Sequence, residues 1–226
     1  MSHDPQHTAS SHVVSGHQTG SKIAGVLLAA GQSTRMGPDN KLLMPIDGMP
    51  IIRKTAISLI EGGLADLLVV TGHQAEEVQS CLADLPLRFV ENTSFASGQA
   101  GSIGVAIERI LNEGHLAALI ALADMPFVTS DLVNAMVANH LNLVAAQGRV
   151  TIPMFNGQRG NPVIWGRDFF ERLMQLSGDI GGRALLEKHS DAVHEFVWTD
   201  DSIHRDIDTP LAYEAAAKDK QGINSS

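Results

Sequence analysis

The loop from Gly31 to Lys41 contains the side chains best suited to chemistry. It carries one cation at Arg35 and a second at Lys41, with a flexible point at Gly37 between them. The loop follows the apolar run IAGVLLAA, which starts at Ile23 and reads as a buried strand. Such a strand would bring backbone N–H groups and two positive side chains to the carboxyl edge of a sheet, where α/β proteins bind anions. We therefore expect the loop to hold a nucleoside triphosphate.

Two carboxylates, Asp124 and Asp208, are expected at the same edge. Asp124 closes a second apolar run, ALIALAD, and a buried carboxylate costs desolvation unless it is hydrogen-bonded or bound to a cation. In the segment DIDTP, alternation turns Asp206 and Asp208 to one side and Ile207 into the core. Asp124 and Asp208 could share one Mg²⁺ bound to triphosphate oxygens. Asp124 alone also fits a cap or turn, and DIDTP alone also fits an ordinary helix start, so the prediction depends on the pair.

Composition limits the classes of partner. The chain has 226 residues, 44% of them apolar, which suits one large α/β domain or two small ones. The formal charge of −9 argues against nucleic acid or an anionic membrane as a partner, although local cations could still bind a small anion. Cys81 is the single cysteine, so neither an intrachain disulfide nor a Cys-based metal site can form. This cysteine usage fits the cytoplasm.

Apolar runs alternate with helical patterns over the first two thirds of the chain. Helical spacing predicts helices from Pro50 to Gly62, over EEVQSCLADL, over IGVAIERILNEG and from Ser130 to about Ala146. The glycine-rich stretch FASGQAGSIG is expected to be a loop before the third helix. Continuous apolar strands indicate a parallel sheet covered on both faces. The strands are expected to begin near Ile23, Asp66, Leu87 and Ala117.

The pattern changes after Gly148. RVTIPMF and NPVIWG read as extended segments joined by NGQRG in a hairpin, followed by the helices FFERLMQL and RALLEKH, the strand AVHEFVW and a last helix from Pro210. This half is expected to complete the sheet and to build a wall that faces the substrate. We expect a disordered tail over 1–21, a single domain over 22–218 and a frayed end over 219–226. The start lacks the apolar run of a signal peptide, and no segment is long enough to span a bilayer.

Seven motifs in order resemble those of the MobA-like nucleotidyltransferases, closest to the molybdenum cofactor cytidylyltransferase branch. They are LLAAGQSTRMGPDNK, LVVTG, SGQAGSIG, LADMPFV, GQRGNPV, GDIGGRALL and DIDTP, and the resemblance runs from about Ile23 to Tyr213. It implies an α/β, Rossmann-like three-layer fold with a mostly parallel sheet and helices on both faces, like that of nucleotide-diphospho-sugar transferases. It also implies Mg²⁺-dependent transfer of CMP from CTP to the phosphate of molybdenum-bound molybdopterin, which gives the cytosine dinucleotide cofactor and pyrophosphate. A molybdenum hydroxylase apo-enzyme is a possible partner.

The resemblance also assigns roles to individual residues. It implies that the catalytic residues are Arg35, Lys41 and Asp124. It also implies that Asp124 and Asp208 bind the metal. The nucleotide would be bound by Leu28, Ala29, Ala30, Gly31, Ser33, Arg35, Lys41, Thr71, Gly72 and Ser102. The pterin phosphate would be faced by Arg159, Gly160, Asn161, Pro162, Asp179 and Arg183.

Three positions bear on the subtype. The spelling LAAG, with Ala30, is typical of cytidylyl rather than guanylyl enzymes, and the methyl group of Ala30 could crowd a purine. Gln99 stands where the family often has Met, and Asn161 where it often has His. Asn can still hydrogen-bond, so these two departures are compatible with activity and leave the acceptor open.

Three alternatives remain open. One is a nucleotidyltransferase of this fold that acts on a sugar phosphate or an alcohol phosphate. Another is an NAD(P)H-dependent oxidoreductase, although the chain lacks G-x-G-x-x-G after the first strand and an acidic residue after Val70-Thr71-Gly72. The third is a non-catalytic carrier or chaperone for a molybdenum enzyme, which the intact Lys41, Asp124 and Asp208 disfavour.

Overall fold

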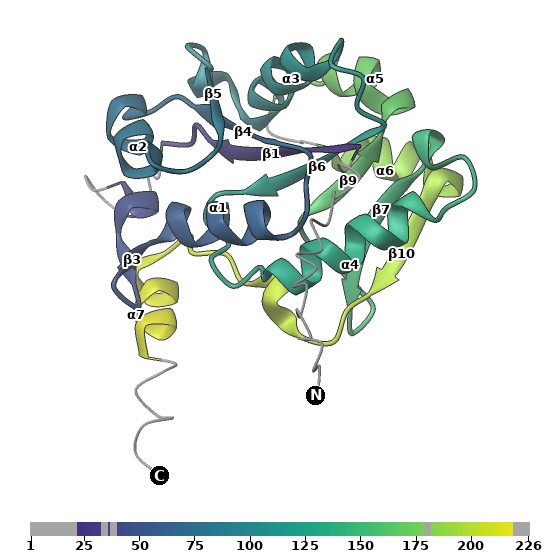
Figure 1. Cartoon of the computed structure of the whole chain (residues 1–226). Helices are drawn as coiled ribbons and strands as arrows, with labels where there is room; N and C mark the ends of the chain where they lie inside the picture. Colours follow the sequence, from purple (N-terminus) through teal and green to yellow (C-terminus); the bar gives the residue numbers. More distant parts are fainter. Residues whose placement is uncertain (1–21, 33–35, 37–39, 179–181, 219–226) are drawn as a thin grey trace, which may run out of the picture.

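The structure is a computed structural model that describes residues 22–32, 36, 40–178 and 182–218 (Figure 1). The expected tails over 1–21 and 219–226 lie outside the described residues, as do Ser33, Arg35 and Asp179 of the predicted site. No helix in the described part of the chain is long and apolar enough to cross a membrane.

One eight-stranded sheet runs through the chain and takes strands from both of its halves. The order along the sheet is β10-β7-β9-β6-β1-β4-β5, with β8 paired to β7. β9 is antiparallel to β6 and β7, β8 is antiparallel to β7, and the other pairings are parallel. The strands are β1 (Ile23–Ala29), β4 (Leu67–Thr71), β5 (Arg88–Glu91), β6 (Ala117–Leu122), β7 (Val150–Phe155), β8 (Gln158–Arg159), β9 (Val163–Gly166) and β10 (Val193–Val197).

Helices cover both faces of this sheet, which confirms the predicted three-layer α/β fold (Figure 1). One core packs α1 (Ile51–Glu61), α2 (Ala75–Leu82), α4 (Ser130–Leu141) and α7 (Pro210–Lys218). The other packs α3 (Gln99–Ile110), α5 (Phe170–Met174) and α6 (Arg183–Lys188). Strand β1 is buried throughout because its alternate side chains enter the two cores: Ile23 and Leu27 lie in the first, Ala24 and Val26 in the second.

The end of β6 is fixed by helix α1. Thr55, fully buried in α1, donates its hydroxyl to the carbonyl oxygens of Ile51 at 3.2 Å and Ala123 at 3.3 Å. A small antiparallel ribbon of β2 (Pro45–Ile46) and β3 (Met49–Pro50) leads into this helix, which ends at Gly62. A Cβ at Gly62 would lie 2.3 Å from a Val133 methyl carbon, so glycine allows α1 and α4 to pack closely. The helix layer thereby fixes the residue next to Asp124.

Three predicted elements differ from the structure. Helix α3 begins at Gln99 inside the expected loop, because Gly98 takes a φ of +106° and ends the preceding turn, Phe95–Ser97. Helix α4 ends at Leu141 rather than near Ala146, and Ala145 then takes a left-handed φ of +54°.

The expected hairpin is also more elaborate than NGQRG alone suggests. β7 turns at Asn156 and Gly157 into the short β8, and β9 then inserts between β6 and β7. The antiparallel pairing of the two predicted segments is confirmed, since β7 pairs with β9. The second half of the chain thus brings Trp165 beside β6 and Arg159 beside β7.

Candidate functional site

The candidate site lies at the carboxyl ends of β1 and β6. Ala123 N donates to the carbonyl oxygen of Leu28 at 3.1 Å, which aligns the two strand ends. Ile207 N donates to the carbonyl oxygen of Asp124 at 2.9 Å, and Ile207 itself is 1% exposed. The segment DIDTP is therefore fastened to the end of β6, with Ile207 in the core as predicted. This attachment brings Asp206 and Asp208 to Asp124.

Lys41 lies between two of these carboxylates. Its Nζ is 2.6 Å from Asp124 Oδ2 and 2.5 Å from Asp208 Oδ1. The Lys41 side chain is 11% exposed and that of Asp124 is 16% exposed. Asn40 positions the lysine, because its side chain accepts a hydrogen bond from Leu42 N at 3.0 Å and caps the short turn that starts at Lys41. The sequence assigned Lys41 to the phosphates and the two aspartates to a metal, and the structure joins all three side chains.

Three carboxylates gather at this point, and the Lys41 ammonium group contacts two of them, Asp124 and Asp208. Candidate ligand oxygens of Asp124, Asp206 and Asp208 lie within 4.8 Å of one another. Burial lowers the pKa of Lys41, but the charges and hydrogen bonds of Asp124 and Asp208 outweigh it, and the pKa is raised. Burial raises the pKa of Asp124 against the effect of Lys41, and the negative charges of Asp208 and Asp206 add to the rise. The shared lysine is thus held in its charged form, whereas burial works against the ionised form of Asp124.

The acidic cluster fits a divalent cation. Asp124 Oδ1 is buried and has no hydrogen-bond partner within the described residues. A buried carboxylate oxygen without a partner is costly, and carboxylate oxygens are the ligands that hard cations prefer. Asp206 was not predicted as a ligand, although its alternation with Asp208 in DIDTP was the available signal.

A first cavity of about 550 Å³ opens beside this cluster. Ser102, which lines it, accepts a hydrogen bond from Asn92 Nδ2 at 3.0 Å, and Asn92 Oδ1 accepts one from Ser94 N at 3.0 Å. Asn92 is 3% exposed and was missed from the sequence, where a single asparagine after a strand carries little signal. Predicted residues in the wall are Leu28, Ala29, Ala30, Gly31, Lys41, Ser102, Asp124 and Asp208, joined by Gln32, Leu42, Phe95, Ala96, Gly98, Gln99, Leu122 and Asp206.

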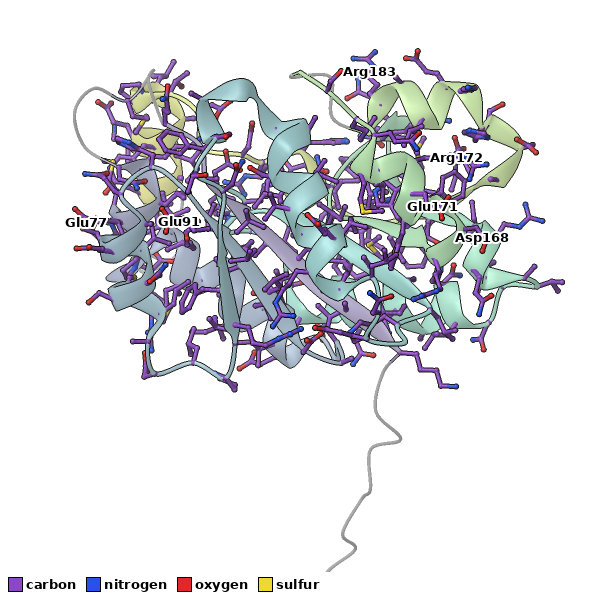
Figure 2. The ribbon with its side chains drawn as sticks, turned by 90° about the horizontal axis from the view of Figure 1, so that it is seen from above. Glu77, Glu91, Asp168, Glu171, Arg172 and Arg183 are labelled. Atoms are coloured by element: carbon purple, nitrogen blue, oxygen red, sulfur yellow. The ribbon has the colours of Figure 1, made fainter. Side chains whose placement is uncertain are left out.

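A second cavity of about 600 Å³ adjoins the first, and both are lined by Leu28, Gln99 and Leu122. It contains the predicted acceptor residues Arg159, Gly160, Asn161 and Arg183, together with Trp165, Ile152 and Glu187 among others. Arg183 projects outward from the start of α6, as Figure 2 shows, and its Nε is 3.4 Å from Glu187 Oε1. Trp165 was not predicted, because an aromatic residue within an apolar strand reads as core.

Three predicted site residues lie away from these walls. Thr71 is fully buried, and its hydroxyl accepts a hydrogen bond from Gln79 Nε2 at 3.3 Å. A Cβ at Gly72 would lie 2.8 Å from the Cβ atoms of Ala30 and Phe95, so Gly72 supports the first cavity from behind. Pro162 is not among the residues that line the second cavity. The direct contacts predicted for Thr71, Gly72 and Pro162 stay predictions.

Comparison with known proteins gives a consistent family. Residues 25–193 match the MobA-like NTP transferase domain. The chain is 27% identical over 195 residues to the nicotine blue oxidoreductase of Paenarthrobacter nicotinovorans, covering 83% of this chain and 92% of that protein. It is 30% identical over 201 residues to the purine catabolism protein PucB of Bacillus subtilis, covering 85% and 94% of the two chains.

Solved structures share the fold at lower identity. A nucleotidyl transferase from Methanothermobacter thermautotroptrophicus superposes with a TM-score of 0.75 at 21% identity, over 90% of this chain and 99% of that one. A Mycobacterium tuberculosis protein solved as a complex with manganese superposes with a TM-score of 0.73 at 23% identity, over 87% of this chain and 98% of that one.

Proposed function

Because the chain belongs to the MobA-like NTP transferase family, we propose that it transfers CMP from CTP to the phosphate of molybdenum-bound molybdopterin. The products are the cytosine dinucleotide cofactor and pyrophosphate. The observation that carries the proposal is the pair of adjoining cavities. One holds a lysine and three aspartates, which suits a metal-bound triphosphate, and the other holds two arginines and a tryptophan, which suits an anionic ring-bearing acceptor.

The reaction brings two anionic phosphates together, so the protein must screen their repulsion and align them. The acceptor phosphate is already deprotonated and needs no general base. Lys41 supplies positive charge at the triphosphate, and the backbone around Ala30 and Gly31 contributes N–H donors at the end of β1. Mg²⁺ held by Asp124, Asp206 and Asp208 would neutralise charge on the triphosphate oxygens. These roles require no covalent intermediate on the enzyme.

The preference for CTP is part of the proposal. Ala30 lines the nucleotide cavity and is 4% exposed, because it packs against Gly72 behind it. The LAAG form of the first motif, with Ala30, is typical of cytidylyl enzymes and supports the preference. Pyrophosphate release that is as fast from GTP as from CTP would contradict this preference.

A second candidate is supported by the name of one relative, the nicotine blue oxidoreductase. A nicotinamide-dependent reduction would need a site for the cofactor, and no G-x-G-x-x-G follows β1. The acidic cluster around Lys41 is better suited to a metal-bound triphosphate. Substrate-dependent oxidation of NAD(P)H, followed by its absorbance, would favour the reductase instead.

The test is pyrophosphate release from each of the four NTPs, with and without molybdenum-loaded molybdopterin. We expect release that depends on both CTP and the pterin. Release that needs a sugar phosphate or an alcohol phosphate instead would retain nucleotidyl transfer and overturn the proposed acceptor. We also propose a cytoplasmic setting and delivery of the product to a molybdenum hydroxylase apo-enzyme.

A further inference from the structure

Lys41 occupies the position that a divalent cation would need. Its ammonium group contacts one oxygen of Asp124 at 2.6 Å and one of Asp208 at 2.5 Å. A Mg²⁺ ion bonds carboxylate oxygens at about 2.0–2.1 Å, so an ion on either of these oxygens would lie within about 5 Å of Nζ. At that distance, in a largely buried site, two positive groups repel each other strongly.

Lys41 cannot leave this position without cost. Its side chain is 11% exposed, and its backbone is held by the turn that Asn40 caps and by the bond from Met44 N to its carbonyl oxygen at 3.1 Å. A buried ammonium group that loses its carboxylates without gaining another anion is destabilising. A free divalent cation offers the lysine no new partner, whereas a triphosphate in the adjacent cavity does.

We propose that Lys41 is a positioning residue that excludes free divalent cations from the Asp124–Asp206–Asp208 cluster. It moves away from these carboxylates only when a triphosphate enters the first cavity. The inference deepens the proposed function, since it takes the first cavity as the triphosphate site. Binding of metal and of triphosphate is then coupled, and by thermodynamic reciprocity each raises the affinity for the other by the same factor. The enzyme would not fill with metal before its nucleotide arrives.

The test measures Mn²⁺ binding to the full chain without nucleotide, by the electron paramagnetic resonance signal of the free ion. The variants are Lys41→Met, which removes the charge, and Lys41→Gln, which keeps an N–H donor and covers the case in which the methionine variant does not fold. Lys54→Met is the matched control, because Lys54 pairs with Asp47 at 2.8 Å outside the cluster. We expect both Lys41 variants to bind Mn²⁺ about 10-fold or more tightly than the unmodified protein, within the usual range of coupling between sites. The control should not change.

Two further arms make the result specific. Adding Asp124→Asn to Lys41→Met should remove the gain in Mn²⁺ affinity, since the gain depends on the Asp124 carboxylate that Lys41 no longer contacts. In the unmodified protein, a non-hydrolysable CTP analogue should raise Mn²⁺ affinity by at least the same 10-fold, again a typical coupling. Lys41 variants that bind Mn²⁺ no more than twofold more tightly than the unmodified protein would overturn the inference.

Failure of the proposed function gives a different result. None of the nucleotide-free measurements involves turnover or an acceptor. A chain that transfers no CMP to molybdopterin, yet whose Lys41 variants gain Mn²⁺ affinity, would refute the proposed reaction and keep the inference. If the protein transfers CMP normally and the Lys41 variants bind Mn²⁺ no more tightly, the proposed reaction stands and the inference about Lys41 is refuted.

Discussion

Asp124→Asn should make the protein more stable and less active. The substitution keeps the shape of the side chain and removes its charge. The carboxyl is 16% exposed, shares Lys41 with Asp208, and has its pKa raised, first of all by burial. A carboxyl with a folded pKa above its unfolded pKa binds its proton more tightly when folded, so its ionisation at neutral pH reduces stability. We expect the free energy of unfolding at pH 7 to rise by about 0.5–2 kcal/mol, the usual gain from a single stabilising substitution.

The same change should reduce nucleotidyl transfer by about 100- to 1000-fold, the usual effect of removing one electrostatic contact to a transition state. Urea denaturation measures the first effect and pyrophosphate release measures the second. Lys41 retains Asp208 at 2.5 Å in this variant, so the ammonium group keeps a partner. The variant is therefore expected to fold, and its loss of turnover would not reflect unfolding.

Asp84→Asn is the matched control, with the opposite sign. Asp84 is a 68% exposed carboxylate that accepts two hydrogen bonds from Arg53, each at 2.6 Å. The hydrogen bonds of Arg53 lower the pKa of Asp84 to about 2, so its ionisation favours the folded state. Asp84→Asn should reduce stability and leave transfer unchanged. The reasoning is refuted if Asp124→Asn is destabilising like the control, or if it transfers CMP at close to the unmodified rate.

Three further predictions follow from the cavity walls and the core. A Cβ at Gly182 would lie 2.4 Å from Trp165 Cζ2, so Gly182→Ala should lower the free energy of unfolding by about 1–3 kcal/mol, measured by urea denaturation. The same variant should raise the KM for the acceptor and leave CTP affinity unchanged. An unchanged KM would contradict the acceptor role of the second cavity. Gln99 lines both cavities, so Gln99→Met should lower kcat for transfer about 10-fold, while CTP affinity measured by calorimetry changes by no more than about twofold. If CTP affinity instead fell by as much as kcat, Gln99 would act on the nucleotide alone. Burial lowers the pKa of His140 to about 4, so as pH falls this histidine is protonated in the unfolded chain before it is protonated in the folded one. The free energy of unfolding should therefore decline by about 3 kcal/mol between about pH 6.5 and 4. His140→Gln should remove this part of the decline in denaturation curves recorded across that pH range.

The layered fold could be predicted from the sequence because its strands are continuous apolar runs. Strand β1 is buried on both faces over its whole length, and only a sheet covered by helices on both sides gives that pattern. The insertion of β9 between β6 and β7 could not be predicted, since strand order depends on contacts far apart in sequence. The early start of α3 could not be predicted either, because it depends on the positive φ of Gly98.

The meeting of Asp124 and Asp208 could also be predicted, because both follow segments that end at one edge of the sheet. The position of Lys41 between them could not, since in the sequence a lysine in a glycine-containing loop indicates an anion and does not distinguish phosphates from carboxylates. The place of Asp206 in the cluster could not be predicted either. It depends on the backbone hydrogen bond from Ile207 N to the carbonyl oxygen of Asp124, which holds this third carboxylate beside Asp124. Trp165 gave no signal because its strand reads as core throughout.

The central claim is most directly tested by following the label of CTP that carries ³²P at the α-phosphate. Incubated with the protein, a divalent cation and molybdenum-loaded molybdopterin, the label should appear in a dinucleotide of cytidine and pterin, with one pyrophosphate released for each label transferred. A chain that leaves the label in CTP under these conditions, while it oxidises NAD(P)H in the presence of a dye-like substrate, would contradict the account.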